Sequence, residues 1–333
     1  MNISEWETLL ELLLPYRPLE VVVESSPFWP WLHDVLTADG VGFTLAHAKE
    51  LRAIAHAEQK NDRVDALLLA RMLQGRLIPR AYPRPSAQRE RARLVRHRAT
   101  LIRQRSRLLH RIHSQLHAGG LSYARGKLNT REGHRWLRQE ATLYLELEKR
   151  RLVDTHLELI RALQPLIRSL DRRIAREADR DPAVGLLRSI PGIGPYRGML
   201  LAAEILPIQR FATPAHLVSY AGLAPRTRSS GDKTRHGRIP AGCNRWLRGA
   251  FVRAALSHRQ QAPSSPVSQS YDRLKERVGW QTARVATARK LCRIAYAMLR
   301  TGELWRGAEP EPSTSADGTS SPDNMRPRAP API

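Results

Sequence analysis

Three acidic residues in the first fifth of the chain have the types and spacing of a divalent-metal site. Glu24 directly follows residues 19–23 (LEVVV), a β-branched run that predicts a buried strand. Open α/β sheets place their ligand sites at the carboxyl ends of such strands. Asp62 and Asp65 are three residues apart in an expected helix, so both carboxylates share a face. The three groups could bind Mg²⁺, which takes oxygen ligands and is often shared with phosphate.

The same acids have a simpler interpretation. An aspartate in the first turn of a helix is stabilised by the helix macrodipole alone, and a glutamate after a strand is often merely exposed. Spacing alone therefore favours this simpler interpretation and leaves the metal site as the second one.

A pair of serines in a basic segment is the second candidate for chemistry. Ser229 and Ser230 precede Gly231 within residues 221–249, AGLAPRTRSSGDKTRHGRIPAGCNRWLRG. Cations beside a serine hydroxyl could bind a scissile phosphate and stabilise the charge of its transition state, leaving the hydroxyl as nucleophile. The alternative is a flexible Ser-Gly loop with nonspecific phosphate contacts. The flanking cations are Arg226, Arg228, Lys233, Arg235 and Arg238.

The charge of the whole chain limits the possible partners. Its 333 residues carry 55 Lys and Arg against 31 Asp and Glu, a formal net charge of +24. Such an excess points to nucleic acid or an anionic membrane surface. No run of about 18 apolar residues occurs, and MNISEWETLL has acids where a signal peptide needs a basic flank. We therefore expect a cytoplasmic protein with no membrane partner.

The small number of cysteines and the lack of a P-loop motif disfavour other classes of protein. Cys243 and Cys292 are too few for a disulfide framework or a cysteine zinc site, and no GxxxxGK[ST] loop indicates a P-loop ATPase.

The positive charge is concentrated in two strips. Between Arg76 and Arg111 the only acid is Glu90, and residues 233–259 contain none. Solvated helix faces are the ordinary explanation, yet two strips with so few acids favour contacts to nucleic-acid phosphates. The candidate contacts are Arg96, Arg98, Arg103, Arg105, Arg107, Arg228, Lys233, Arg235, Arg238, Arg245 and Arg248.

A glycine turn near the middle of the chain resembles a helix-hairpin-helix. Residues 189–198 read SIPGIGPYRG and are followed by apolar MLLAAEI. In that motif, glycines such as Gly192 and Gly194 expose backbone N–H groups to a phosphate at a helix N-terminus, giving sequence-independent contact. A plain PGIG turn is the alternative.

Apolar spacing predicts the remaining elements. A helix, a strand, a helix, a strand and a helix capped by Asn61 are expected at residues 3–14, 19–23, 27–36, 41–46 and 61–74. A long basic helix follows at 87–118. A second helical stretch covers roughly 136–177, kinked at Pro165, and its spacing fits either a coiled-coil arm or helical hairpin or an ordinary bundle helix.

These patterns predict four segments of different character. The expected boundaries are 1–86 for a small α/β domain, 87–182 for a helical connector, 183–306 for a mainly α domain and 307–333 for a proline-rich, disordered tail.

Taken together, the motifs resemble the transposases of insertion-sequence family 110, with its 116 and 902 relatives. The resemblance rests on VVVESSPFWPWLHDVL, QKNDRVDALLLARML, SIPGIGPYRG, LVSYAGLAPRTRSSG, GRIPAGCNRWLRGAFVRAA and ARVATARKLCRIAYAMLRTGELW. It implies an α/β plus α fold: an RNase H-like domain with a DEDD set of metal ligands, a coiled-coil connector and a C-terminal serine domain.

The resemblance also assigns roles. By position, Glu24 is the second acid of the set, Asp62 the third and Asp65 the fourth, and Ser230 is the serine that would attack a DNA phosphate while the carboxylates hold Mg²⁺. Family members act as homo-oligomers guided by a structured RNA. The resemblance thus predicts a DNA transposase or recombinase with DNA and guide RNA as partners.

One part of the family pattern has no counterpart here. The first acid of the set lies on an early strand, whereas no Asp occurs among the 23 residues before Glu24. We expect a chain shortened at its amino end, an incomplete RNase H-like domain and weak or no activity. The alternatives are a catalytically inactive nucleic-acid-binding remnant and a structural-maintenance or repair-type helix-hairpin-helix protein.

Overall fold

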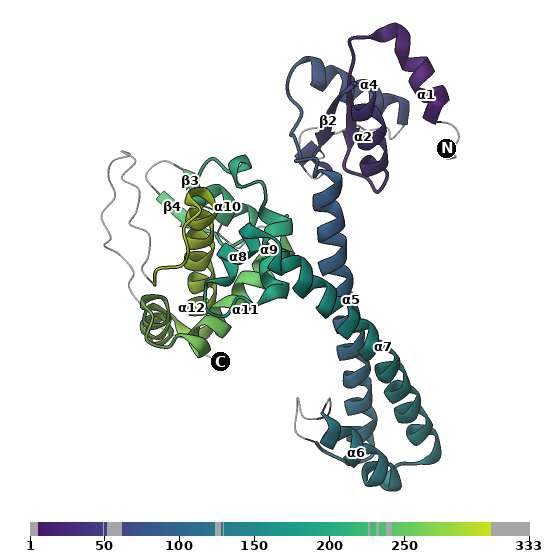
Figure 1. The fold of residues 1–333 in the computed structure, drawn as a ribbon, viewed down its shortest axis with the longest axis vertical. Helices are drawn as coiled ribbons and strands as arrows, with labels where there is room; N and C mark the ends of the chain where they lie inside the picture. The colour runs from purple at the N-terminus through teal and green to yellow at the C-terminus, as the bar shows by residue number, and fades with distance from the viewer. Residues whose placement is uncertain are drawn as a thin grey trace.

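The protein is mostly helical and consists of a small α/β unit, a long helical arm and a helical body (Figure 1). This computed structural model describes residues 6–48, 50–51, 62–123, 128, 130–225, 227–230, 233–237 and 242–307. In those residues no helix is long and apolar enough to cross a membrane. The predicted cap Asn61, the cation Arg238 and the tail from residue 308 lie outside this description.

The α/β unit matches the predicted order of elements. Its elements are α1 (Trp6–Leu13), η2 (Leu14–Tyr16), β1 (Glu20–Glu24), α2 (Trp29–Ala38), β2 (Gly42–Ala46) and α4 (Asp62–Gln74). Strands β1 and β2 are parallel, in a register that runs from Glu20 opposite Gly42 to Glu24 opposite Ala46. The expectation of a strand buried on both faces is wrong, because β1 is only half-buried and pairs with a single strand in the described part.

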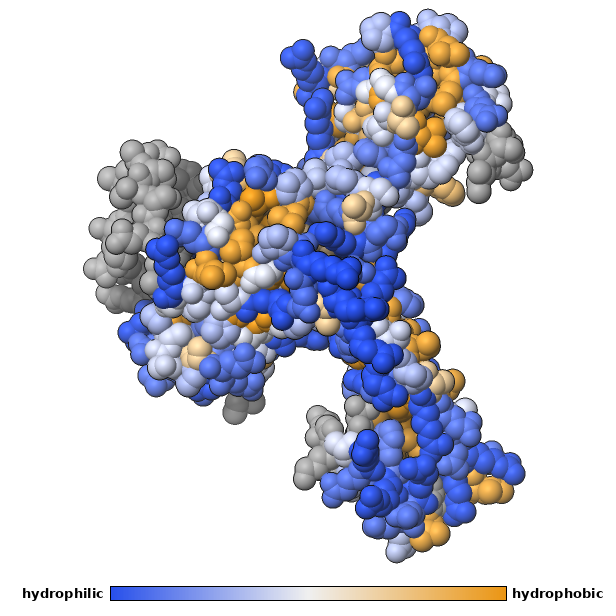
Figure 2. Space-filling view, viewed as in Figure 1, coloured by the Kyte–Doolittle hydropathy of each residue, from blue (hydrophilic) through white to orange (hydrophobic). Residues whose placement is uncertain are grey.

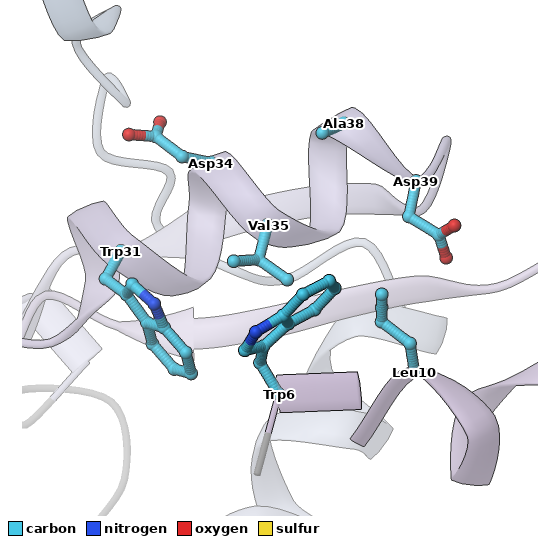
Figure 3. A pocket seen from close by; sticks show the side chains of 7 residues that line it. All are labelled: Trp6, Leu10, Trp31, Asp34, Val35, Ala38 and Asp39. Atoms are coloured by element: carbon cyan, nitrogen blue, oxygen red, sulfur yellow. The ribbon is translucent and has the colours of Figure 1, made fainter. Parts of the chain in front are cut away.

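An apolar cavity of about 520 Å³ lies between α1 and α2. Figure 3 shows the indole rings of Trp6 and Trp31 beside each other, under Val35. At the rim, Asp34 forms an ion pair with Arg89, which lies in the long helix at 86–118, so this carboxylate connects the unit to the arm.

The arm is formed by two long helices and a small helical cap. They are α5 (Ser86–Ala118), α6 (Arg131–Gln139), η4 (Ala141–Tyr144) and α7 (Leu147–Asp179). The chain runs out along α5 and returns along α7 (Figure 1). The predicted basic helix is confirmed, whereas the single stretch 136–177 is wrong: the chain turns between α6 and α7, where buried Leu145 packs on Gly119. Helix α7 continues through Pro165 as one element.

The arm is held together by the predicted apolar stripe of α7. Its residues Val153, Leu157 and Ile160 are at most 2% exposed and pack in one cluster with residues of α5. The partners on α5 are Leu108, Ile112 and Leu116. This arrangement is the helical hairpin that the spacing allowed.

The body encloses the largest core of the molecule. Its elements are α8 (Pro182–Arg188), α9 (Pro195–Ile205), η5 (Ile208–Arg210), α10 (Pro214–Tyr220), β3 (Thr227–Ser230), β4 (Lys233–His236), α11 (Arg245–Gln261) and α12 (Pro266–Thr301). Phe251 of α11 is fully buried in this core, and α12 is interrupted at Gly279, whose φ is +79°.

A fully buried carboxylate, Glu204 of α9, joins the arm to the body. Arg84 donates to its Oε2 at 2.6 Å, and Arg96 of α5 donates to its Oε1 through Nε at 2.9 Å. Asn244, the N-cap of α11, donates to Oε2 at 2.8 Å, and the hydroxyl of Tyr220 accepts from both Arg84 and Asn244. Each oxygen of the buried charge therefore has cationic or amide donors, as a charge out of water requires.

The same network shifts two pKa values. Burial alone would lower the pKa of Arg84, but the charge of Glu204, the Tyr220 hydroxyl and the hydrogen bonds to both together outweigh it and raise that pKa above its ordinary value. Burial would raise the pKa of the Tyr220 hydroxyl, yet Arg84 and Arg210 beside it lower that pKa. Both shifts favour the charged state of groups around Glu204.

We expect Glu204→Ala to lower the free energy of unfolding by about 3–5 kcal/mol, because it leaves two guanidinium groups without their buried counter-charge. Denaturant unfolding followed by circular dichroism measures the loss. Glu90→Ala is the control: Glu90 pairs with Arg93 and its side chain is 64% exposed, so the cost should stay below about 1 kcal/mol. Equal costs for the two variants would contradict the anchoring role.

Candidate nucleic-acid interface

The glycine turn predicted from the sequence joins α8 to α9. Gly192 has a φ of +92°, and a Cβ built on it would lie 2.5 Å from the backbone nitrogen of His258 in α11. Only glycine fits this close crossing in the left-handed region. Gly194 is the N-cap of α9, with Pro195 at its first position. The turn is therefore pressed against α11.

Two side chains fix the turn in place. Gln261 accepts a hydrogen bond from the N–H of Gly192 at 2.8 Å, so that N–H is already bonded within the protein. The imidazole of buried His258 bonds the carbonyl of Pro191 at 2.9 Å and the hydroxyl of Ser265 at 2.8 Å. Burial lowers the pKa of His258, which keeps the ring neutral in this packed position.

Beside the turn lies a cavity of about 590 Å³, between α5, the start of α9 and α11. We call it the arginine groove. None of the described residues that line it is acidic. Its cations and aromatic rings are Arg98, Arg103, Arg197, Arg245, Arg253, Tyr196 and Trp246.

The groove is preorganised by contacts around its guanidinium groups. Arg98 donates to Asp171 of α7 at 2.8 Å and lies 4.4 Å from the centre of the Tyr196 ring. Arg103 lies 4.9 Å from the centre of the Trp246 ring. Rings that carry a guanidinium on one face restrict its motion at low entropic cost.

The electrostatics of the groove favour an anion. Burial, and then the nearby charge of Arg253, lower the pKa of Arg197. Cations that repel one another in this way are stabilised when a phosphate neutralises them. A cationic groove beside a helix N-terminus is thus suited to the sugar–phosphate backbone of a nucleic acid.

Of the other arginines predicted to contact nucleic acid, some bond to groups of the protein and others are exposed. Arg96 is committed to buried Glu204, and half-buried Arg105 donates to Gln164 at 3.1 Å. Arg107 and Arg248 are exposed outside the groove. Their roles in binding nucleic acid stay predictions.

Residues 227–230 and 233–236 of the serine segment form two antiparallel strands, so Ser229 and Ser230 lie in a strand and not in the flexible loop that was the alternative. Strands β3 and β4 are antiparallel, with Ser230 opposite Lys233 and Arg228 opposite Arg235. Opposed positions, and positions two apart, share a face of such a ladder. Positions 228, 230, 233 and 235 therefore lie on one face, and Ser229 lies on the other, opposite Thr234.

The predicted metal ligands come from neighbouring elements. Glu24 is half-buried at the carboxyl end of β1, and α4, which contacts β1, carries exposed Asp62 and half-buried Asp65 in its first turn. Within the described residues, no three acidic, histidine or cysteine side chains are grouped closely enough to hold one ion. The carboxylates suit Mg²⁺ chemically, but these residues alone do not form a preformed cage for it.

Sequence reasoning missed several residues of the groove. Arg197 follows the glycine turn, a motif whose known phosphate contacts come from backbone N–H groups, so the motif gives no signal for this side chain. Arg253 was visible in the basic strip, and its spacing of eight residues from Arg245 places both on one face of a helix. Tyr196 and Trp246 carried no signal of their own.

Comparisons with known proteins point to transposases. Residues 184–272 match the family model described as the IS116/IS110/IS902 transposase family. Residues 4–119 match a second transposase model, that of the DEDD type from the IS110 group. The two models cover both the α/β unit with α5 and most of the body.

Curated relatives agree with the models. The chain is 34% identical over 144 residues to the IS110 uncharacterized 43.6 kDa protein of Streptomyces coelicolor, covering 43% of this chain and 35% of that protein. It is 31% identical over 163 residues to the putative transposase y4pF/y4sB of Sinorhizobium fredii, covering 48% and 42%. It is 31% identical over 180 residues to the IS116 uncharacterized 44.8 kDa protein of Streptomyces clavuligerus, covering 53% and 44%. The matches span less than half of each relative.

We expect Arg103→Ala with Arg253→Ala to weaken binding to duplex DNA and to reduce the slope of log K against log salt by about two, because each lost phosphate contact releases about one counterion fewer. Fluorescence anisotropy over a salt series measures both quantities. The matched control is Arg259→Ala with Arg306→Ala, two arginines outside the groove that are already paired with acids. An unchanged slope in the groove variant would contradict the assignment.

Proposed function

Since this chain belongs to the IS116/IS110/IS902 transposase family, we propose that it is a DNA transposase that cuts and rejoins strands with Ser230 as nucleophile. The observation that carries the proposal is the arginine groove, a cationic cavity at a helix N-terminus whose described lining residues include no acid and come from both segments that match transposase models. DNA is the substrate in this proposal, and the groove binds its backbone.

The face of the hairpin supports Ser230 over Ser229. Position 230 shares its face with the cations at 228, 233 and 235, whereas position 229 does not. Cations beside the nucleophile bind the phosphate and stabilise the negative charge that develops on its oxygens. The register of the two strands thus supports Ser230 as the proposed nucleophile.

The proposed step is a transesterification. The Ser230 oxygen bonds to phosphorus, the bond from phosphorus to one sugar oxygen breaks, the hydroxyl proton leaves to solvent and the departing sugar oxygen takes up a proton. The product is a phosphoserine ester with DNA. Because one phosphodiester replaces another, a second strand can be joined by the reverse attack without a nucleotide cofactor.

The acids Glu24, Asp62 and Asp65 are the proposed ligands of a divalent cation, Mg²⁺. A DEDD family implies divalent metals in general. Bound beside phosphate oxygens, such an ion supplies charge neutralisation. Because the described residues hold no three-ligand cluster, further ligands would come from the DNA phosphate or from outside the described part.

A structured RNA is the further partner in the proposal, in line with the family resemblance. The support for this partner is physical: the exposed arginines that line the groove can neutralise the phosphates of RNA as well as those of DNA. The rival function is a remnant that binds nucleic acid and cuts nothing, and the lack of a grouped carboxylate site in the described residues favours it.

We expect this chain, mixed with Mg²⁺ and labelled DNA from either side of its own gene, to form at most a small amount of a covalent adduct that survives denaturing electrophoresis, in line with the weak activity expected from the sequence, with the phosphate mapped to Ser230 by mass spectrometry. Ser230→Ala should abolish the adduct, and Ser229→Ala should keep it, because only position 230 shares a face with the cations.

The reaction is run with and without RNA transcribed from the same flanks. An adduct that persists in Ser230→Ala would contradict the nucleophile. Binding without any adduct, in both RNA arms, would favour the inactive remnant.

Self-association is proposed through an exposed stripe on α7. Leu152, Leu159 and Leu166 recur every seven residues and are 45%, 50% and 55% exposed. Figure 2 shows hydrophobic surface along the edge of the arm that α7 forms. Seven-residue spacing of leucines is the pattern of helix–helix pairing, so a second copy of α7 is the proposed occupant.

We expect Leu159→Glu with Leu166→Glu to reduce the oligomer to monomer, because two charges would be buried in the seam. Sedimentation velocity measures the mass. Leu304→Glu, at a 61% exposed leucine outside the arm, is the control. A monomeric parent chain, or an oligomer unaffected by the double variant, would contradict this interface.

A further inference from the structure

The tip of the arm carries a second cationic cavity, far from the arginine groove. Its volume is about 530 Å³, and it is lined by Arg131, His134, Arg135, Arg138 and Gln139, all from α6. We call it the arm-tip cradle. No acid lines it. Figure 2 shows hydrophilic surface over this part of the arm.

The opposite side of α6 fixes the cradle rigidly. Leu137 is fully buried in the cluster that joins α5 and α7, and Trp136 stacks on Tyr123 with ring centres 4.3 Å apart. Thr130 caps the helix by accepting from the N–H of Gly133 at 3.1 Å. This packing holds the apolar side of α6 against the arm and leaves its arginines facing outward.

The cradle's polar groups are incompletely used inside the protein. Arg131 and Arg135 are exposed and form no ion pair with the residues that the structure describes. Arg138 is held by a bond from its Nε to the carbonyl of His134 at 3.2 Å. The Nε2 atom of His134 is buried and has no hydrogen-bond partner in the described part.

An unsatisfied buried polar atom costs about 1–3 kcal/mol and calls for a missing partner. Burial, then the charges of Arg138 and Arg161, lower the pKa of His134. The lowered pKa keeps the His134 ring neutral. The charges on the described lining of the cradle are therefore those of its arginines, and none of them is negative.

We propose that the arm-tip cradle binds the phosphodiester backbone of a nucleic acid, as a second site separate from the arginine groove. Three arginines on one helical face match successive phosphates, and a phosphate or ribose oxygen would meet the free nitrogen of His134. From Arg98 to the end of α5 is about 30 Å at 1.5 Å per residue. At 3.4 Å per base pair, a ligand needs about nine pairs to reach from the groove to the cradle.

This proposal does not depend on strand cutting, because a chain that forms no adduct would still bind here. The test uses the full chain carrying Ser230→Ala, with two probes of about 15 base pairs, which matches the length of α5: a DNA duplex and an RNA duplex. The variant is Arg131→Ala with Arg135→Ala and Arg138→Ala. Anisotropy over a salt series gives the affinity and its salt slope.

We expect the triple alanine variant to bind at least one probe more than tenfold more weakly, with a slope smaller by about two to three. The probe affected shows whether the backbone is that of DNA or RNA. The same three positions changed to lysine should restore most of the slope, since lysine keeps the charge.

The matched control is Arg93→Ala with Arg151→Ala and Arg173→Ala, three exposed arginines of the arm that are each paired with an acid. This control should bind within about twofold of the parent chain. Equal losses in control and cradle variants, or no loss of either probe in the cradle variant, would overturn the proposal. Circular dichroism checks that α6 stays folded.

Discussion

One buried carboxylate determines how the arm meets the body. Glu204 is 0% exposed, and its donors come from the residues before α5, from α5 itself and from the N-cap of α11. Because an uncompensated charge out of water is very costly, these segments must converge on α9. The arginine groove lies between α5, α9 and α11, so its walls are positioned by the same convergence.

This constraint divides the arginines by function. Arg84 and Arg96 are needed to neutralise Glu204, and Arg98 is paired with Asp171 while still facing the groove. Arg103 and Arg253 line the groove and stay exposed. Some of the arginines in a basic sequence neutralise buried acids, and the sequence does not distinguish those acids from exposed ones. The net charge therefore overstates the number of arginines that can contact a ligand.

Local patterns predicted most of the elements, whereas most contacts between distant parts of the chain could not be predicted from them. The strands at 19–23 and 41–46, the basic helix and the apolar stripe of α7 follow from periodicity, which is a property of neighbouring residues. The turn at Leu145 and the burial of Glu204 depend on partners more than 20 residues away. The hairpin around Ser230 was missed because Gly231 and the surrounding cations favoured a loop.

One continuous helix, α5, lines the arginine groove and, at its outer end, packs against α6, which carries the cradle. Helix α5 has no break between Ser86 and Ala118, and its apolar seam with α7 is closed along its outer half. A helix braced in this way keeps its length, so Arg98 in the groove and the outer end of α5 keep a separation of about 30 Å. A nucleic acid that reached both would neutralise cations that repel one another in the free chain, and its binding energy would depend on its length and stiffness as well as on contacts. The arm then acts as a spacer that favours ligands long and rigid enough to reach both cavities.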